Sequence, residues 1–205
     1  MIDPPRYIDS WLHEVALIAE AIERSYVAEM LDLLEQIKYR GGRLFILGVG
    51  GSAANAAHAA NDFRRFARLE AYAPTADIAE MTALANDIGW HSIFEEWLKE
   101  SRLTASDGIL VLSVNGGTSN ISPHLVAAVR YVRERGASIL AIVGRKDGYA
   151  AQHAHAWIAV PCPDEDLRTP HAESFQLVLT HLLAWSMRAR MIASVSRSPS
   201  GEPIE

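Results

Sequence analysis

The chain has 205 residues and a mass of 22.5 kDa, which favours one domain and suffices for a large hydrophobic core. Acidic residues outnumber basic ones by 25 to 19, with no Lys/Arg run, which argues against non-specific binding to nucleic acid or anionic membranes. No apolar stretch approaches the roughly 20 residues needed to cross a bilayer, and the N-terminus lacks signal-peptide features. The single cysteine, Cys162, cannot form an internal disulfide. We therefore expect a cytoplasmic protein.

The first 42 residues are expected to form two helices. Apolar side chains recur at helical spacing over residues 7–22 and 27–38, and Gly41 and Gly42 would stop the second helix. We expect a helical hairpin whose apolar stripe is buried by its own domain or by a neighbouring subunit. The stripe consists of Trp11, Leu12, Val15, Ile18 and Ile22.

After Gly42, short apolar runs alternate with helical patterns. This alternation predicts a parallel sheet covered on both faces, a three-layer α/β domain over residues 1–195. The tail is rich in Ser, Pro and Gly and is expected to be disordered from residue 196 to 205. Strands are predicted at 43–48, 108–113, 138–144 and 156–161, with an edge strand near 71–74. Helices are predicted at 52–66, 79–89, 92–101, 122–134 and 171–195.

Two glycine-containing loops follow predicted strands, at residues 48–52 and 113–119. Glycines let the backbone approach an anion, and a helix N-terminus offers free N–H groups with a favourable dipole. Ser52, Ser113, Thr118 and Ser119 add hydroxyl groups, so the loops can bind a phosphate without a lysine. The alternative is a pair of tight turns with helix caps. Neither loop has the spacing of a nucleotide-binding motif.

Two pairs of histidine and carboxylate residues lie on predicted helices. His58 and Asp62 are four residues apart, and Glu173 and His181 are eight apart, so we expect each pair to share a helix face. Two imidazoles and two carboxylates can hold a divalent metal ion or perform acid–base chemistry. The alternative is that Asp62 pairs with a nearby arginine, and that the histidines have no special role.

Other candidates carry less weight. His153 and His155 are more consistent with a solvated helix end than with a metal site. His171 either reaches the substrate or caps the last helix. Cys162 lies between two prolines with no evident activating group, so we assign it no catalytic role.

Residues 48–58, 85–89 and 113–120 resemble the sugar isomerase (SIS) family, most closely its phosphoheptose isomerase branch. The resemblance covers nearly the whole chain. It implies a flavodoxin-like sheet of five parallel strands and a homotetramer with shared active sites, in which the N-terminal helices pack. It also implies conversion of sedoheptulose 7-phosphate to D-glycero-D-manno-heptose 7-phosphate, or of a related sugar phosphate, through an enediol for surface-polysaccharide synthesis. One zinc ion per subunit, or none, is expected.

The resemblance also implies roles for individual residues. Asp62 would be the base, His181 the acid, and Glu173 a further catalytic carboxylate. The chain departs from the common family pattern at Val49 and at several of the implied site residues, which is typical of a variant branch. The implied metal ligands are His58, Asp62, Glu173 and His181. The implied substrate-binding residues are Gly51, Ser52, Asp62, Asn86, Asp87, Ser113, Val114, Asn115, Thr118 and Glu173.

Three functions remain open at the level of sequence. The first is the isomerase, which needs one group to move a proton between C1 and C2 and another to serve the carbonyl oxygen. The second is a non-catalytic SIS module that binds a sugar phosphate or another protein, against which the four filled polar positions argue. The third is a regulatory sugar-phosphate sensor, which normally carries a DNA-binding domain for which 205 residues leave no room.

Overall fold

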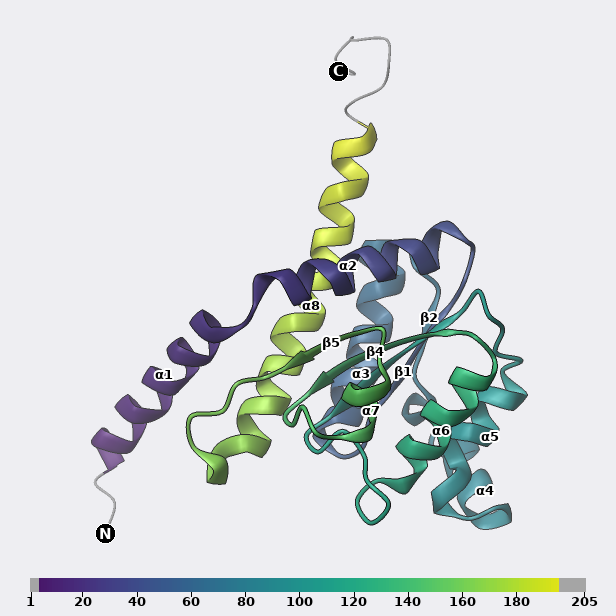
Figure 1. Ribbon diagram of the computed structural model, residues 1–205, viewed down its shortest axis with the longest axis horizontal. Coiled ribbons are helices and arrows are strands. Elements are labelled where there is room, and N and C mark those ends of the chain that lie inside the picture. Colours follow the sequence, from purple (N-terminus) through teal and green to yellow (C-terminus); the bar gives the residue numbers. More distant parts are fainter. Residues whose placement is uncertain (1–3, 196–205) are drawn as a thin grey trace.

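The computed structural model describes residues 4–195, so the predicted disorder of 196–205 lies outside the described residues. All five predicted strands are present, joined by helices (Figure 1). The strands are β1 (Leu44–Leu47), β2 (Ala71–Tyr72), β3 (Gly108–Ser113), β4 (Ser138–Val143) and β5 (Ala156–Ala159). The helices are α1 (Pro4–Ala21), α2 (Arg24–Tyr39), α3 (Gly51–Asp62), α4 (Ile78–Asp87), α5 (Ile93–Glu100), α6 (Pro123–Glu134), α7 (Tyr149–His153) and α8 (Arg168–Val195).

The strands form one parallel sheet in the order β2-β1-β3-β4-β5. This is the flavodoxin-like order, and it confirms the predicted fold class. The direction of winding reverses between β1 and β3. Ligands of open α/β sheets bind at such a switch point, beyond the carboxyl ends of the strands.

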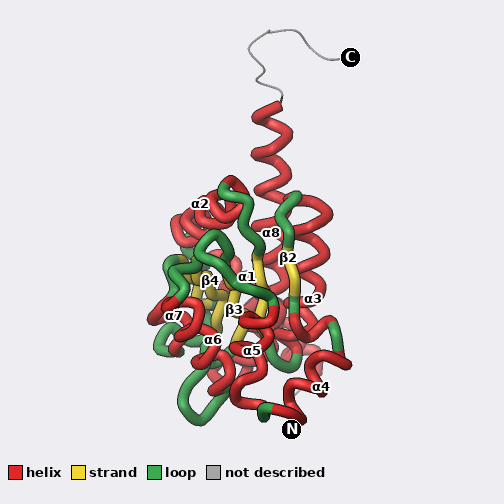
Figure 2. Tube along the Cα trace, turned by 90° about the vertical axis from the view of Figure 1, so that its right-hand side faces the viewer, coloured by secondary structure: helices red, strands yellow, loops and turns green. Residues whose placement is uncertain are grey.

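Side chains alternate between the two faces of the sheet and supply two separate cores. Leu44 and Ile46 of β1 pack with α2, α3 and α8, whereas Phe45 and Leu47 pack with α4, α5, α6 and α7. Figure 2 shows the strands lying between these helices. Because both faces are covered, β1, β3 and β4 are buried at every position, which explains their continuous apolar sequences.

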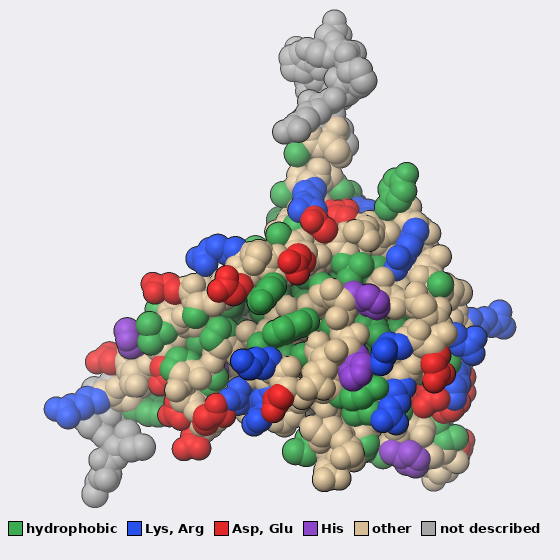
Figure 3. Space-filling model, viewed as in Figure 1, with side chains coloured by type: hydrophobic (Ala, Val, Ile, Leu, Met, Phe, Trp, Pro, Cys, Tyr) green, Lys and Arg blue, Asp and Glu red, His purple; other side chains and the backbone are tan. Residues whose placement is uncertain are grey.

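The N-terminal helices differ from the expected hairpin. α1 and α2 follow one another across the molecule with a bend between them, rather than folding back side by side (Figure 1). Ile18 and Ile22 are buried in the chain's own core, but Leu12 is 62% exposed. Figure 3 shows other hydrophobic side chains exposed among charged ones along α1. The predicted stripe is therefore only partly covered within one chain.

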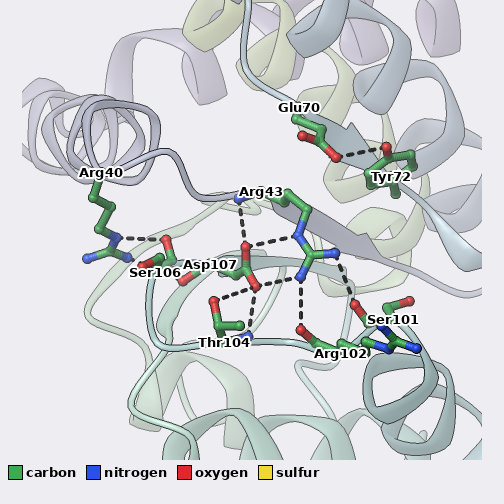
Figure 4. A network of polar contacts seen from close by, with 9 residues as sticks. All are labelled: Arg40, Arg43, Glu70, Tyr72, Ser101, Arg102, Thr104, Ser106 and Asp107. Carbon is green, nitrogen blue, oxygen red and sulfur yellow. Dashed lines mark hydrogen bonds and ion pairs between the residues drawn. The ribbon is translucent and has the colours of Figure 1, made fainter.

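An ion pair between the buried Asp107 carboxylate and the partly exposed Arg43 closes the amino edge of the sheet (Figure 4). The Asp107 carboxylate accepts hydrogen bonds from the backbone N–H and guanidinium of Arg43 and from the N–H and hydroxyl of Thr104, at 2.8–3.1 Å. Burial alone would raise the pKa of Asp107, but these bonds outweigh it and lower the pKa below its ordinary value. The polar groups at this edge thus serve to join β1 to the segment before β3.

Three local features differ from the predicted elements. A short helix, α7, ends at His153, where the sequence predicted a helix end but gave no bounds for the helix. The last helix begins at Arg168, three residues before the predicted start. The predicted helix over 52–66 changes after Asp62 to a π-helical turn at Phe63–Ala67, which ends at Arg68 in the left-handed conformation. A π-turn has no clear sequence signature, and such turns occur frequently at functional sites.

None of the helices described between residues 4 and 195 has the length and apolar character needed to cross a membrane.

His124 on α6 provides a test of packing on the sheet face that α4, α5, α6 and α7 cover. The side chain is buried against Phe94 and Trp90, with ring centroids 5.1 and 5.5 Å away, and neither ring nitrogen has a hydrogen-bond partner. Burial lowers the pKa of His124 from 6.5 to about 4. The folded state therefore favours neutral imidazole, and its stability falls as the pH drops from the unfolded-state value toward the folded-state one.

We expect the free energy of unfolding to fall between pH 6.5 and pH 4 by up to about 3 kcal/mol more in the wild type than in His124→Leu. Urea titrations at a series of pH values measure this difference. Parallel pH profiles for the two proteins would contradict it.

Candidate active site at the carboxyl edge of the sheet

The two glycine-containing loops lie side by side where the winding of the sheet reverses. The first follows β1 and leads into α3, and the second follows β3. They border a hollow of about 190 Å³ that is open to solvent. Residues from the start of α8 and of α6 complete its wall. The lining residues are Val49, Ser52, Leu112, Ser113, Val114, Asn115, Ser122, Thr169 and Glu173.

Gly51 brings α3 and α8 together at the hollow. A Cβ atom at Gly51 would lie 2.4 Å from Oε2 of Glu173, so a larger residue there would displace this carboxylate from the first turn of α3. The N-terminus of a helix stabilises a negative charge through its free N–H groups and dipole. The α3 N-terminus thus already faces one anionic side chain, that of Glu173.

An amide pair continues this contact between the two helices. Nδ2 of Asn55 donates to the backbone oxygen of Glu173 at 2.8 Å and to Oε1 of Gln176 at 3.4 Å. Gln176 is fully buried. These bonds fix the position of α8 along α3, and they lie between the hollow and a second polar cluster further along the same helices.

This second cluster contains His58 and Asp62 of α3 and His181 of α8. The two Nε2 atoms are 2.9 Å apart, and Oδ2 of Asp62 lies 3.3 Å from Nε2 of His58 and 3.2 Å from Nε2 of His181. The Asp62 side chain is 7% exposed, whereas the two imidazoles are nearly half exposed. The cluster is therefore reached from solvent on its histidine side.

The donor set of this cluster fits a zinc ion. Its three ligand atoms lie within 4.8 Å of one another. Two nitrogens and one carboxylate oxygen are the ligands of many catalytic zinc sites, and adjacent ligands of tetrahedral zinc lie roughly 3.3 Å apart. With both histidines in the tautomer that leaves Nε2 unprotonated, the three atoms converge on one position that a cation can occupy.

The arginine alternative for Asp62 is wrong, because Arg64 instead donates to the backbone oxygen of Ala71 and Arg65 lies over the ring of Phe66. Glu173 is also not part of the group of potential metal ligands that the structure brings together. Eight residues of helix separate Glu173 from His181 by about 12 Å, which places Glu173 at the hollow instead.

The implied substrate-binding residues divide among four places, of which Asp62 in the histidine cluster is one. Ser52, Ser113, Val114 and Asn115 line the hollow with Glu173, and Gly51 lies beside them. The Thr118 hydroxyl accepts hydrogen bonds from the N–H groups of residues 120 and 121 and faces a neighbouring hollow. Asn86 and Asp87 are exposed at the end of α4, where the Asn86 amide donates to Asp87 at 2.8 Å.

The remaining sequence candidates have structural contacts. Nε2 of His171, which is fully buried, lies 3.0 Å from a carboxylate oxygen of Glu14 on α1. Nδ1 of His155 accepts the N–H of Ile139 at 3.0 Å. Cys162 donates to a backbone oxygen, and burial raises the pKa of its thiol, which disfavours the reactive thiolate.

Ser122 and Thr169 line the hollow although the sequence did not single them out. Ser122 precedes α6 with a positive φ of 57°, and Thr169 lies in the first turn of α8. The only available signal was their position at helix starts that face the carboxyl edge of the sheet.

The family model described as SIS domain matches residues 7–144. The phosphoheptose isomerase of Geotalea daltonii is 29% identical over 192 residues, which cover 90% of this chain and 95% of the relative. That of Thermodesulfovibrio yellowstonii is 30% identical over 164 residues, 78% of this chain and 77% of the relative.

The fold is also found in solved structures. The phosphoheptose isomerase from Neisseria gonorrhoeae superposes with a TM-score of 0.79 at 24% identity, covering 91% of this chain and 100% of that one. The enzyme from Francisella tularensis gives 0.77 at 19% identity, covering 93% and 100%. The predicted relationship to phosphoheptose isomerases is confirmed. Fold, loops and relatives together place this chain in the SIS domain family.

Proposed function

We propose that the chain catalyses aldose–ketose isomerisation of a phosphorylated sugar, with sedoheptulose 7-phosphate and D-glycero-D-manno-heptose 7-phosphate as the first pair to test. The observation that carries this proposal is the arrangement along α3 and α8. A hollow lined by hydroxyl and amide groups lies at one end, and a cluster of two histidines and a carboxylate lies further along. The names of the curated relatives support the same reaction.

The spacing between the two polar groups suits such a substrate. His58 lies six residues after Ser52 on α3, which corresponds to about 9 Å of helical rise. A phosphate bound by the loops would direct an extended sugar chain along this seam, with its reacting C1–C2 end toward the His58–Asp62–His181 cluster. Glu173 would then face the middle of the sugar, within reach of its hydroxyl groups.

Isomerisation through an enediol needs a base that moves a proton between C1 and C2 and an acid that serves the oxygen. We assign the base to Asp62 and the acid to His181. The low exposure of Asp62 keeps its carboxylate from full hydration, and the partly exposed imidazole of His181 is accessible to a sugar oxygen. Glu173 is the competing base, because it lines the hollow.

Zinc is the cofactor that we propose for the cluster, held by His58, Asp62 and His181. A zinc ion bound there would polarise the carbonyl and the adjacent hydroxyl of the sugar. Asp62 contacts the imidazoles through Oδ2, so its second oxygen can accept a proton.

The proposed assembly is a homotetramer. α1 leaves Tyr7, Ile8, Leu12 and Leu17 exposed, and the outer face of α8 leaves Val178, Leu182, Trp185 and Ile192 exposed. Burial of these side chains between subunits would recover hydrophobic free energy of about 25 cal/mol per Å². The partly exposed imidazole of His181 lies on α8 as well, which favours an active site shared between subunits. We propose the cytoplasm as the compartment, where phosphorylated sugars are metabolised.

Asp62→Asn and His181→Gln should each lower kcat for sedoheptulose 7-phosphate by about 10²- to 10⁴-fold, with a smaller effect on KM. The amide replacements keep hydrogen-bonding capacity while abolishing proton transfer. Deuterium incorporation from solvent at C2, followed by NMR, measures proton abstraction directly. Wild-type exchange in Asp62→Asn, together with no exchange in Glu173→Gln, would transfer the base to Glu173. Full activity in all three variants, or a wild type that binds the sugar without converting it, would favour a non-catalytic module.

The zinc assignment is tested by elemental analysis of purified protein. We expect about one zinc per chain in the wild type and a large loss in His58→Gln. His153→Gln is the matched control, because His153 lies at the end of α7, where its ring contacts Tyr149 and is not part of the histidine cluster. Glu173→Gln should retain its zinc, and a loss there would add Glu173 to the ligand set.

Light scattering at micromolar concentration should give four times the chain mass for the wild type. The double substitution Ile8→Arg and Leu12→Arg on α1 should yield a smaller species, because charges would enter the proposed interface. Tyr39→Arg at the end of α2, where the side chain is 95% exposed, is expected to remain tetrameric. A monomeric wild type would contradict the proposed assembly.

A further inference from the structure

The hollow between the two loops carries no positively charged side chain among the residues that line it. Its one charged member is Glu173, a carboxylate, and it lies against the helix N-terminus that would otherwise favour an anion. Val114 adds no side-chain donor. A phosphate bearing close to two negative charges therefore meets an electrostatically unfavourable wall unless a cation lies nearby.

A second hollow adjoins the first one at Asn115, which lines both. It has a volume of about 170 Å³ and contains Thr118 from the loop after β3. It also contains three residues from the loop after β4: Arg145, Asp147 and Gly148. Arg145 is the only cation lining either of these two hollows.

The loop that carries Arg145 is held firmly against the loop after β3. A Cβ atom at Gly116 would lie 2.9 Å from Cα of Gly148, so the two backbones approach more closely than side chains would allow. The N–H of Ala150 donates to the Gly116 oxygen at 2.8 Å, and that of Tyr149 donates to the Gly117 oxygen at 2.9 Å. Arg145 is therefore placed beside Asn115 by backbone contacts.

The Arg145 guanidinium is oriented by Asp147. Its Nε and Nη2 atoms donate to the two oxygens of Asp147, each at 3.1 Å. A guanidinium has five N–H donors, so this pair leaves the Nη1 side for a further acceptor. Arg145 is about half exposed, so a ligand in the hollow can reach it.

We propose that Arg145, with Asn115 and the loop around Thr118, forms the subsite for the substrate phosphate, and that Asp147 both orients Arg145 and moderates its affinity. The proposal rests on the proposed sugar-phosphate function and names the residue that selects phosphorylated over unphosphorylated sugars. The substrate phosphate and the Asp147 carboxylate then compete for the Arg145 guanidinium. Removing Arg145 and removing the charge of Asp147 must consequently have opposite effects on binding.

Calorimetric titration with sedoheptulose 7-phosphate, and with unphosphorylated sedoheptulose, tests this assignment. We expect Arg145→Gln to weaken binding of the phosphorylated sugar by about tenfold and to leave binding of the unphosphorylated sugar unchanged. Arg145→Lys should recover part of the loss, since it restores the charge without the planar fork. Asp147→Asn should tighten binding of the phosphorylated sugar severalfold.

Arg133→Gln is the matched control, because Arg133 is an exposed arginine on α6 that lines a separate hollow. Wild-type affinity in Arg145→Gln, or weaker binding in Asp147→Asn, would overturn the subsite and leave the proposed reaction intact. A wild type that binds the phosphorylated sugar through Arg145 without isomerising it would support the subsite and overturn the reaction. Failure of the wild type to bind any sugar phosphate would overturn both.

Discussion

The close packing of α3 against α8 is the constraint on which the rest of the candidate site depends. Small side chains on the buried face of α3, at Ala56, Ala59 and Ala60, let larger residues of α8 such as Phe175 and Leu179 pack closely against it. Only at this short separation can an imidazole of one helix meet a carboxylate of the other. At the same separation, the absence of a side chain at Gly51 leaves room for the Glu173 carboxylate beside the start of α3. A bulkier residue on this face of α3 would therefore disturb the histidine cluster and the hollow together.

The amino edge of the sheet contributes to stability, whereas the carboxyl edge carries the candidate site. At the amino edge, the buried carboxylate of Asp107 is saturated by donors from Arg43 and Thr104, so it has little capacity left for a ligand. At the carboxyl edge, hydroxyl, amide and carboxylate groups line open hollows, and several donors remain exposed to solvent. A protein can leave polar groups incompletely paired there because water satisfies them until a substrate arrives. The amino edge supplies the rigid connection that keeps the loops at the carboxyl edge in position.

Charged side chains are unevenly distributed along the carboxyl edge of the sheet. The carboxylates of Asp62 and Glu173 lie along the α3–α8 seam, while Arg145, paired with Asp147, lines the neighbouring hollow that shares Asn115. A ligand with one anionic end and one polar, neutral end would be oriented by this difference, since its anionic end is repelled from the carboxylates. This arrangement would orient such a ligand although neither glycine-containing loop has the spacing of a nucleotide-binding motif.

Local sequence patterns determined the class of this protein. Continuous apolar runs predicted the buried strands, because a parallel sheet covered on both faces excludes polar side chains from both. The spacing of His58 and Asp62 predicted their meeting, because residues four apart on a helix are neighbours. Sequence could not join His181 to that pair while leaving Glu173 at the hollow, since this depends on the position of α8 along α3. Nor could it place Arg145 beside Asn115, because no local pattern reports a contact between the loops after β3 and β4. Those decisions belong to the tertiary structure, in which packing between distant segments fixes which side chains share a space.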